Sequence, residues 1–209
     1  MLRDDPGQSL SLKSKVAREA AYLLYRGFEK EYKQAKLKAA ETLGTNSLPS
    51  NRQVALHLDK IAEETEGAVR RKHLLQMRQQ AYELMKVLKD YHPVLVGSVW
   101  RGTIHHNSDL DLTVYSHDPQ DVLKKINQNN LKILGTEWVT VPQKDLKKEY
   151  LHIYLELSNN QEVEVIVRSP EEMGQTRTCE IFGDRIFGLN LRELKKLLEE
   201  DPNKRFLPI

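Results

Sequence analysis

The chain has 209 residues, of which 39% are hydrophobic and 30% are charged, a balance typical of a folded globular protein rather than a disordered one. No apolar run reaches the length of a membrane span, and the polar start of the chain lacks the apolar core of a secretory signal. The single cysteine, Cys179, excludes an intramolecular disulfide, and together these features predict a cytoplasmic protein.

The net charge of +2 is unevenly distributed along the chain. Residues 1–92 carry 17 Lys and Arg against 12 Asp and Glu, whereas residues 93–209 carry 15 against 18. A basic half beside an acidic half would help to hold a polyanion. Well-solvated charged helices explain the same pattern, and the sequence favours this simpler explanation.

Helical periodicity dominates the first part of the chain. Apolar residues recur every three or four positions over residues 12–43, which predicts one amphipathic helix that Gly44 ends. A second helix is predicted over residues 50–66, with Ser or Asn as its cap. Gly67 then separates this helix from a third, predicted over residues 68–90.

After Pro93 the pattern changes to short apolar runs and to strict alternation, which indicate strands. Ser158-Asn159-Asn160 is predicted to be a hairpin turn, and residues 181–187 a further small hairpin. The other predicted elements are strands at 94–96, 110–114, 131–141, 150–157 and 162–167, a helix at 119–127, and a helix at 191–200 that Asn190 caps.

These elements predict an α+β protein with two parts. An N-terminal helical region, residues 1–92, precedes a small mixed-sheet domain, residues 93–209. The apolar stripes of the helices can pack on the chain's own sheet or on a second copy. The sequence therefore leaves the oligomeric state open, with a homodimer as one alternative.

Two short motifs after Pro93 carry the candidate chemistry. Gly97 and Ser98 lie between a strand and a helix, where unpaired N–H groups and the positive end of the helix dipole favour anions. Asp109 and Asp111 are two apart on a strand and therefore share a face. Adjacent carboxylates repel unless a cation lies between them, and Mg²⁺ prefers carboxylates together with phosphate oxygens. Each motif alone is common, but their order brings a phosphate site and a metal site together.

This segment resembles the signature of the DNA polymerase beta-like nucleotidyltransferase superfamily. The signature is a Gly-Ser turn, commonly followed by Arg-Gly, and then Ser-Asp-hydrophobic-Asp-hydrophobic. The chain is also similar as a whole to archaeal nucleotidyltransferases with an N-terminal helical region. The resemblance implies that residues 93–209 form a nucleotidyltransferase domain. The matching residues are Gly97-Ser98, Arg101-Gly102 and Ser108-Asp109-Leu110-Asp111-Leu112.

The superfamily implies a third carboxylate, on a later strand and between hydrophobic neighbours. Glu164 fits because a valine flanks it on each side, while Glu162 and Glu156 are alternatives. A glutamate here is a mild departure from the pattern, because its longer side chain shifts the place of the metal. The resemblance implies that Asp109, Asp111 and Glu164 are catalytic and hold Mg²⁺ or Mn²⁺.

The resemblance also implies a reaction, in which a nucleoside monophosphate passes from a nucleoside triphosphate such as ATP to an acceptor, with release of pyrophosphate. The triphosphate would lie against Gly97 and Ser98. Arg101 either neutralises phosphate charge or pairs with a structural carboxylate, and the sequence favours neither. Metal ions would activate the acceptor hydroxyl, with Glu164 as candidate general base.

The acceptor is left open, with RNA, another protein and a small molecule as alternatives. A basic run on the third predicted helix could contact nucleic acid, although a solvated surface is the favoured explanation. Two rival functions are a catalytically silent nucleotide- or nucleic-acid-binding module, and an antitoxin-like partner that modifies another protein. The intact carboxylates favour an enzyme over the silent module. The basic run consists of Arg70, Arg71, Lys72 and Arg78.

Overall fold

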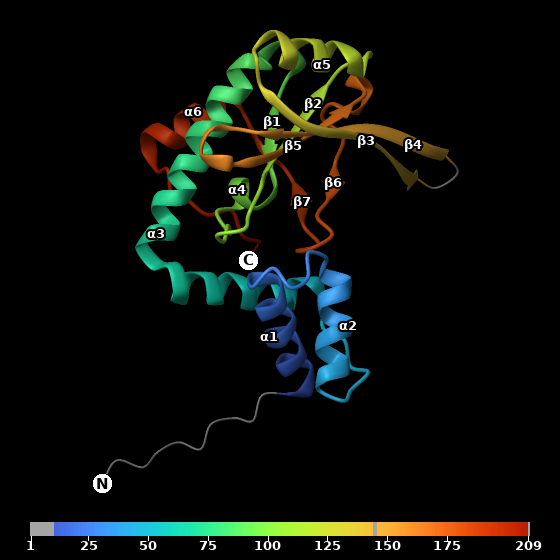
Figure 1. Ribbon diagram of the computed structural model, residues 1–209, viewed down its shortest axis with the longest axis vertical. Coiled ribbons are helices and arrows are strands. Elements are labelled where there is room, and N and C mark those ends of the chain that lie inside the picture. The colour runs from blue at the N-terminus through green and yellow to red at the C-terminus, as the bar shows by residue number, and fades with distance from the viewer. Residues whose placement is uncertain (1–10, 144–145, 209) are drawn as a thin grey trace. The chain divides into compact units, whose positions relative to one another are not determined.

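The computed structural model describes residues 11–143 and 146–208, which fall into two compact units (Figure 1). Within the described residues, the first unit comprises 11–66 with 179–183, and the second comprises 67–178 with 184–208. The predicted boundary between residues 92 and 93, which separates the N-terminal helical region from the mixed-sheet domain, falls inside the second unit and stays a prediction. None of the described helices is long and apolar enough to cross a membrane.

Three helical segments build the first unit: α1 (Leu12–Tyr25), α2 (Tyr32–Thr42) and the first part of α3 (Asn51–Val87). Their apolar faces share one core, which is rich in alanine and in which Val16 and Val54 are fully buried. Small side chains at such a core let helix backbones approach closely. The segment 179–183 belongs to the same unit, and Asn51 Nδ2 donates to the carbonyl of Glu180 at 3.2 Å.

The single helix predicted over residues 12–43 is wrong, because two helices occupy this range. Gly27 has a φ of 69°, a left-handed conformation that glycine adopts without steric cost. The N–H of Phe28 donates to the carbonyl of Leu23 at 3.0 Å, which closes the end of α1. The apolar periodicity continues through this break, so the sequence pattern did not indicate where the helix ends.

Gly67 interrupts α3 as the sequence predicts. Its φ of 50° and ψ of −119° lie outside the helical region, although helical residues precede and follow it. The prediction of two helices that meet at Gly67 is therefore confirmed. The same glycine begins the second unit, to which the rest of α3 belongs.

A six-stranded mixed sheet is the framework of the second unit, with the strand order β3-β4-β5-β2-β1-β8. Among the described strands of this sheet, only β2 and β5 are parallel, and the other neighbouring strands are antiparallel. Its strands are β1 (Val94–Val96), β2 (Leu110–Tyr115), β3 (Lys132–Gln143), β4 (Leu146–Glu156), β5 (Glu162–Arg168) and β8 (Leu189–Asn190).

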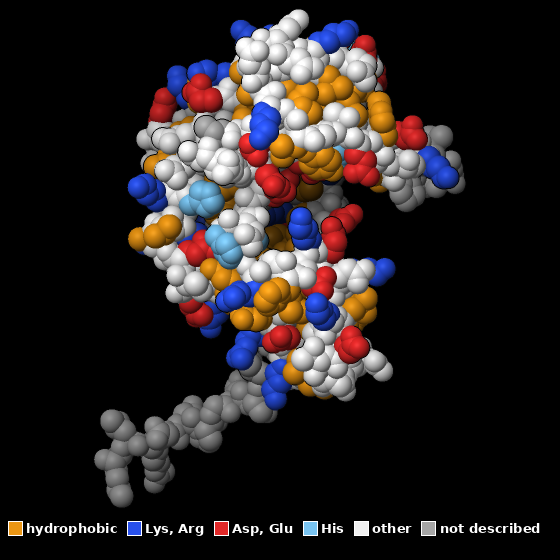
Figure 2. Space-filling model, viewed as in Figure 1, with side chains coloured by type: hydrophobic (Ala, Val, Ile, Leu, Met, Phe, Trp, Pro, Cys, Tyr) orange, Lys and Arg blue, Asp and Glu red, His pale blue; other side chains and the backbone are white. Residues whose placement is uncertain are grey.

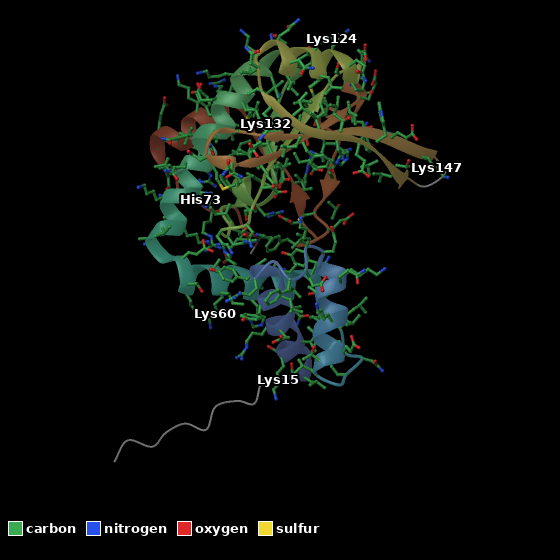
Figure 3. The ribbon with its side chains drawn as sticks, in the orientation of Figure 1. Lys15, Lys60, His73, Lys124, Lys132 and Lys147 are labelled. Carbon is green, nitrogen blue, oxygen red and sulfur yellow. The ribbon has the colours of Figure 1, made fainter. Side chains whose placement is uncertain are left out.

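Short helices and a two-stranded ribbon complete this unit. They are α4 (Gly97–Arg101), α5 (Pro119–Gln128), α6 (Leu191–Glu200), the 3-10 turns η1 (Lys89–Tyr91), η2 (Ser158–Asn160) and η3 (Pro170–Glu172), and the ribbon strands β6 (Arg177–Thr178) and β7 (Arg185–Ile186). In Figure 3, Lys124 marks α5, while Lys132 and Lys147 mark the beginning of β3 and the outer end of the β3–β4 hairpin.

Most of the predicted elements of this unit are confirmed. The predicted hairpin turn at 158–160 joins β4 to β5, and Asn159 and Asn160 adopt the left-handed conformation that asparagine tolerates. Asn190 caps α6 in a reciprocal capping box with Glu193. The small hairpin predicted over 181–187 is misplaced, because β6 pairs with β7 and most of the predicted segment is the connection between them.

The two faces of the sheet differ in character. On one face Leu112, Ile153 and Val165 are fully buried and share a core with α5, α6 and the second part of α3. The opposite face carries Asp111 and Glu164, which are half-buried. Alternation along each strand separates the two sets. The helices thus stabilise the sheet from one side and leave polar groups on the other.

Arg78 connects several backbone segments inside the second unit and is fully buried. Its guanidinium donates to the carbonyls of Val99 and Trp100 in α4 at 3.1 and 2.9 Å. It also donates to the carbonyls of Pro202 and Lys204 at 2.6 and 2.9 Å. Burial lowers the pKa of Arg78 to about 10. The side chain therefore ties α4 to the C-terminal segment.

Arg70 is also buried, and its Nε donates to the carbonyl of Ile104 at 2.7 Å. The predicted basic surface on this helix is therefore wrong for Arg70 and Arg78, whereas Arg71 and Lys72 are exposed. A run of cations on a helix does not reveal which members face inward, because an arginine can reach buried carbonyls along its apolar stem.

Replacing Arg78 with Met is expected to lower the free energy of unfolding by about 3 kcal/mol or more, because buried carbonyls lose a charged donor. Urea denaturation measures this loss. Lys72→Met removes an exposed charge from the same helix and should change stability by less than about 0.5 kcal/mol. Similar losses in both variants would contradict the role assigned to Arg78.

Candidate active site

The Gly-Ser turn lies directly against Asp111, the second member of the Asp pair. Val96 pairs with Asp111 across β1 and β2, and α4 begins at the next residue, Gly97. The Oδ2 atom of Asp111 occupies the position that a Cβ at residue 97 would take, and Gly97 has a φ of 69°. Both features restrict this position to glycine. The turn and the carboxylate therefore form one structural unit.

Two further carboxylates, Asp109 and Glu164, lie near enough to Asp111 to interact with it electrostatically. Glu164 on β5 lies beside Asp111 in the parallel register of the two strands, and the exposed Asp109 immediately precedes β2. Burial, followed by the negative charges of Asp109 and Glu164, raises the pKa of Asp111 to about 8. Figure 2 shows Asp and Glu side chains grouped on the surface of the sheet-bearing unit. A cation at this place would relieve the repulsion.

The geometry supports Glu164 as the third acid over its two alternatives. Glu164 is half-buried beside Asp111, whereas Glu162 is exposed and lies one pleat earlier on the same face of β5. Glu156 forms an ion pair with Lys132 Nζ at 2.5 Å. Neither alternative has Asp111 as its direct cross-strand neighbour.

His152 holds Glu164 from the neighbouring strand. Its Nδ1 lies 2.7 Å from Oε1 of Glu164, and Tyr154 pairs with Glu164 across β4 and β5. Burial, then the charges of Glu164 and Glu137, raise the pKa of the Tyr154 phenol. His152 lies between the buried Leu151 and Ile153 along β4, on the opposite face, and the register between β4 and β5 brings it to Glu164.

The three predicted nucleotide-binding residues differ in what they contact. Ser98 Oγ is buried and has no hydrogen-bond partner among the described residues, so it is available to a ligand. Arg101 is buried, and its guanidinium donates to both carboxylate oxygens of Asp184, at 2.6 and 3.2 Å, and to the carbonyl of Phe206 at 3.1 Å. These contacts support the structural alternative for Arg101 and leave Gly97 and Ser98 as the phosphate-binding candidates.

The oxygen donors of this site suit a hard divalent cation such as Mg²⁺ or Mn²⁺. As placed, no three His, Cys, Asp or Glu side chains of the described part of the chain are arranged to hold a metal ion. Oε1 of Glu164 instead lies 2.7 Å from Nδ1 of His152. The raised pKa of Asp111 nevertheless marks a place where a positive charge would be favourable. The residues therefore fit the ion in chemistry and charge.

Comparison with known proteins gives a family match and distant structural neighbours. The sequence model of the nucleotidyltransferase domain family matches residues 76–184. No curated protein matches the chain significantly. A cytoplasmic RNA terminal U-transferase is 16% identical with a TM-score of 0.30, over 56% of this chain and 34% of that chain. The Cid1 poly(U) polymerase is 16% identical with a TM-score of 0.31, over 53% and 37%. The chain thus spans about a third of the length of these structures.

The raised pKa of Asp111 predicts how stability depends on pH. In the unfolded chain this carboxyl ionises at its ordinary pKa of 3.8, whereas the folded protein resists its ionisation up to about pH 8. Metal-free protein should therefore lose stability relative to Asp111→Asn as the pH rises through this interval. Thermal melts in chelator should show a small difference in Tm between the two proteins at about pH 5. At about pH 9 the Tm of Asp111→Asn should be clearly higher than that of the wild type.

The exposed Glu162 provides the control, because Glu162→Gln should follow the wild-type protein across the same pH range. If Asp111→Asn is less stable than the wild type at about pH 9, the ionised carboxylate is stabilising and the electrostatic description is wrong.

Gly97→Ala tests the close approach to Asp111. The new methyl group would meet the carboxylate and place alanine at positive φ, so stability should fall by about 1–3 kcal/mol. Gly135→Ala is the matched control, because nothing lies within 4 Å of a Cβ at that position. Urea denaturation of both variants measures the difference, and a Gly97→Ala protein as stable as Gly135→Ala would refute the steric constraint.

Proposed function

We infer the activity from one premise: the chain belongs to the nucleotidyltransferase domain family, whose model matches residues 76–184. This match confirms the family resemblance that the segment from Gly97 to Asp111 indicates. We propose that the protein transfers a nucleoside monophosphate from a nucleoside triphosphate to an acceptor hydroxyl, with Mg²⁺ or Mn²⁺ as cofactor. The observation that carries the proposal is the carboxylate of Asp111, which lies against the Gly97 turn and beside Glu164.

The turn at Gly97 and Ser98 would bind the triphosphate of the donor. Glycine leaves the backbone open at this position, so phosphate oxygens can approach the N–H groups that begin α4. The buried Ser98 Oγ, which has no partner in the described structure, would supply a further hydrogen bond. These groups would bind the nucleoside triphosphate through its phosphates, and they would not contact its base.

Asp109, Asp111 and Glu164 would hold the metal. A divalent ion at this place supplies charge neutralisation of the phosphates and a lower pKa for the acceptor hydroxyl. Asp111 and Glu164 lie on two neighbouring parallel strands and Asp109 immediately precedes one of them, so their relative positions depend on the β2–β5 register. Because that register is fixed by a buried apolar face, the carboxylates are held by the core of the unit.

Glu164 would also accept the proton of the acceptor. The acceptor oxygen attacks the α-phosphorus, the bond from this phosphorus to the bridging oxygen breaks, and pyrophosphate leaves. The proton passes from the acceptor oxygen to the Glu164 carboxylate. His152, at 2.7 Å from Oε1, orients that carboxylate and is a positioning residue.

The central experiment incubates the purified protein with Mg²⁺ and nucleoside triphosphates labelled at the α-phosphate, together with total RNA or an RNase-treated protein extract. The wild-type protein should move label into macromolecules. Asp111→Asn and Glu164→Gln should reduce the transfer rate by about 10²–10⁴-fold, because metal binding and proton transfer are lost.

Glu162→Gln is the matched control, since it removes an exposed carboxylate from the same face of β5 and should keep most of the transfer activity. An active Glu164→Gln with an inactive Glu162→Gln would reassign the third acid. Triphosphate binding without transfer to any acceptor would instead support the silent binding module, and transfer to protein alone would support the protein-modifying alternative.

A further inference from the structure

A cavity of about 560 Å³ lies in the second unit, at the opposite end of β2 from Asp109. Its walls come from η1, β1, the end of β2, the β6–β7 ribbon and the beginning of α6. The volume falls within the range of about 300–1,000 Å³ that is usual for small-ligand sites. A single nucleotide fits such a space, whereas a double helix does not.

Five of the fifteen described residues that line this cavity are basic, and none of the fifteen is Asp or Glu. Arg192 is the second residue of α6, in a first helical turn where the dipole disfavours positive charge. Within the described chain, Lys89, Arg185 and Arg192 form no ion pair with a carboxylate. Uncompensated cations that converge on a cavity favour an anionic ligand. The basic lining residues are Lys89, His92, Arg177, Arg185 and Arg192.

Aromatic side chains accompany these cations. Phe187 is 71% exposed, although its ring is apolar, and Tyr115 forms part of the wall. The guanidinium of Arg185 lies 5.1 Å from the centroid of the Phe187 ring, so charge and aromatic surface are presented together. Cations beside exposed rings are the combination that binds single-stranded nucleic acid, through phosphates and stacked bases.

The cavity and the three carboxylates lie along the same strand face. Asp111, Thr113 and Tyr115 alternate on that face of β2, and four residues of strand separate the two sites by about 13 Å. Arg177 Nη1 donates to Thr113 Oγ1 at 3.5 Å between them. Burial, then the charge of Arg168, lower the pKa of Arg177, which means that its charged form is disfavoured. A bound anion would stabilise this charged form.

We propose that this cavity binds a nucleotide of a single-stranded nucleic acid and thereby guides the acceptor strand toward the carboxylates. The role as acceptor site rests on the proposed nucleotidyl transfer, whereas the binding itself does not. An acidic protein segment would satisfy the cations but would not use the exposed ring of Phe187. The combination of charge and aromatic surface therefore favours nucleic acid.

The test uses the full-length protein and a fluorescein-labelled single-stranded RNA of about ten nucleotides, with chelator and without nucleoside triphosphate. Fluorescence anisotropy gives the Kd at several salt concentrations. The double variant Arg185→Gln/Arg192→Gln should weaken binding by about tenfold or more, and it should reduce the slope of log K against log salt by about 1.4.

The control is Lys195→Gln/Lys196→Gln, which removes the same charge from exposed positions of α6 outside the cavity. It should change Kd by less than about twofold. Phe187→Ala should weaken binding by about fivefold or more through lost stacking, and Phe187→Trp should restore it. Because Phe187 is exposed, circular dichroism is expected to show unchanged folding for both variants.

Three results would overturn the inference: wild-type protein that does not bind the RNA, equal effects of the cavity and control variants, or full displacement of the RNA by polyglutamate at matched charge. The last result would assign the cavity to an acidic protein segment. Transfer activity is measured separately with α-labelled nucleoside triphosphates. Binding of RNA in the cavity without transfer would refute the proposed function and leave the cavity assignment standing. Transfer without RNA binding that depends on the cavity residues would refute the cavity assignment and leave the proposed function standing.

Discussion

The contact between the Asp111 carboxylate and the backbone of Gly97 is the constraint on which the rest of the site depends. It fixes where β1 ends, where α4 begins and how closely a phosphate site can approach a carboxylate. The other end of α4 is held by Arg78, which binds the carbonyls of Val99 and Trp100. A helix of five residues has little stability of its own, so these two attachments position it.

The same contact has an electrostatic consequence. Bringing Asp111 into a half-buried position beside Asp109 and Glu164 makes its ionised form unfavourable, as its raised pKa records. Proteins retain such an unfavourable charge at sites where a bound ligand of opposite charge compensates it. Without that ligand, the protein is expected to be less stable than a variant with a neutral side chain at this position. The cationic cavity near Tyr115 has the opposite charge, so the face of β2 carries an acidic and a basic end. This polarity suits the proposed transfer, in which polyanionic substrates bind beside a metal ion at the acidic end.

Features that depend on local sequence were predictable, whereas those that depend on the pairing of distant segments were not. The turn at Gly97 and the alternation around Asp111 are local, and most strands followed from the same alternation. The break at Gly27 was missed because apolar periodicity continues through it. The burial of Arg78 depends on a C-terminal segment far away in sequence. The contact of His152 depends on strand register, which one sequence does not reveal.

The most direct test of the central claim is a crystal structure with Mn²⁺ and a non-hydrolysable nucleoside triphosphate analogue, in which anomalous scattering locates the metal. We expect Mn²⁺ bound by oxygens of Asp109 and Asp111, and the triphosphate against Gly97 and Ser98. The Glu164 carboxylate should supply a further oxygen ligand to the metal. Manganese or triphosphate bound elsewhere on the protein, with these residues in contact with neither, would contradict the assignment of this site.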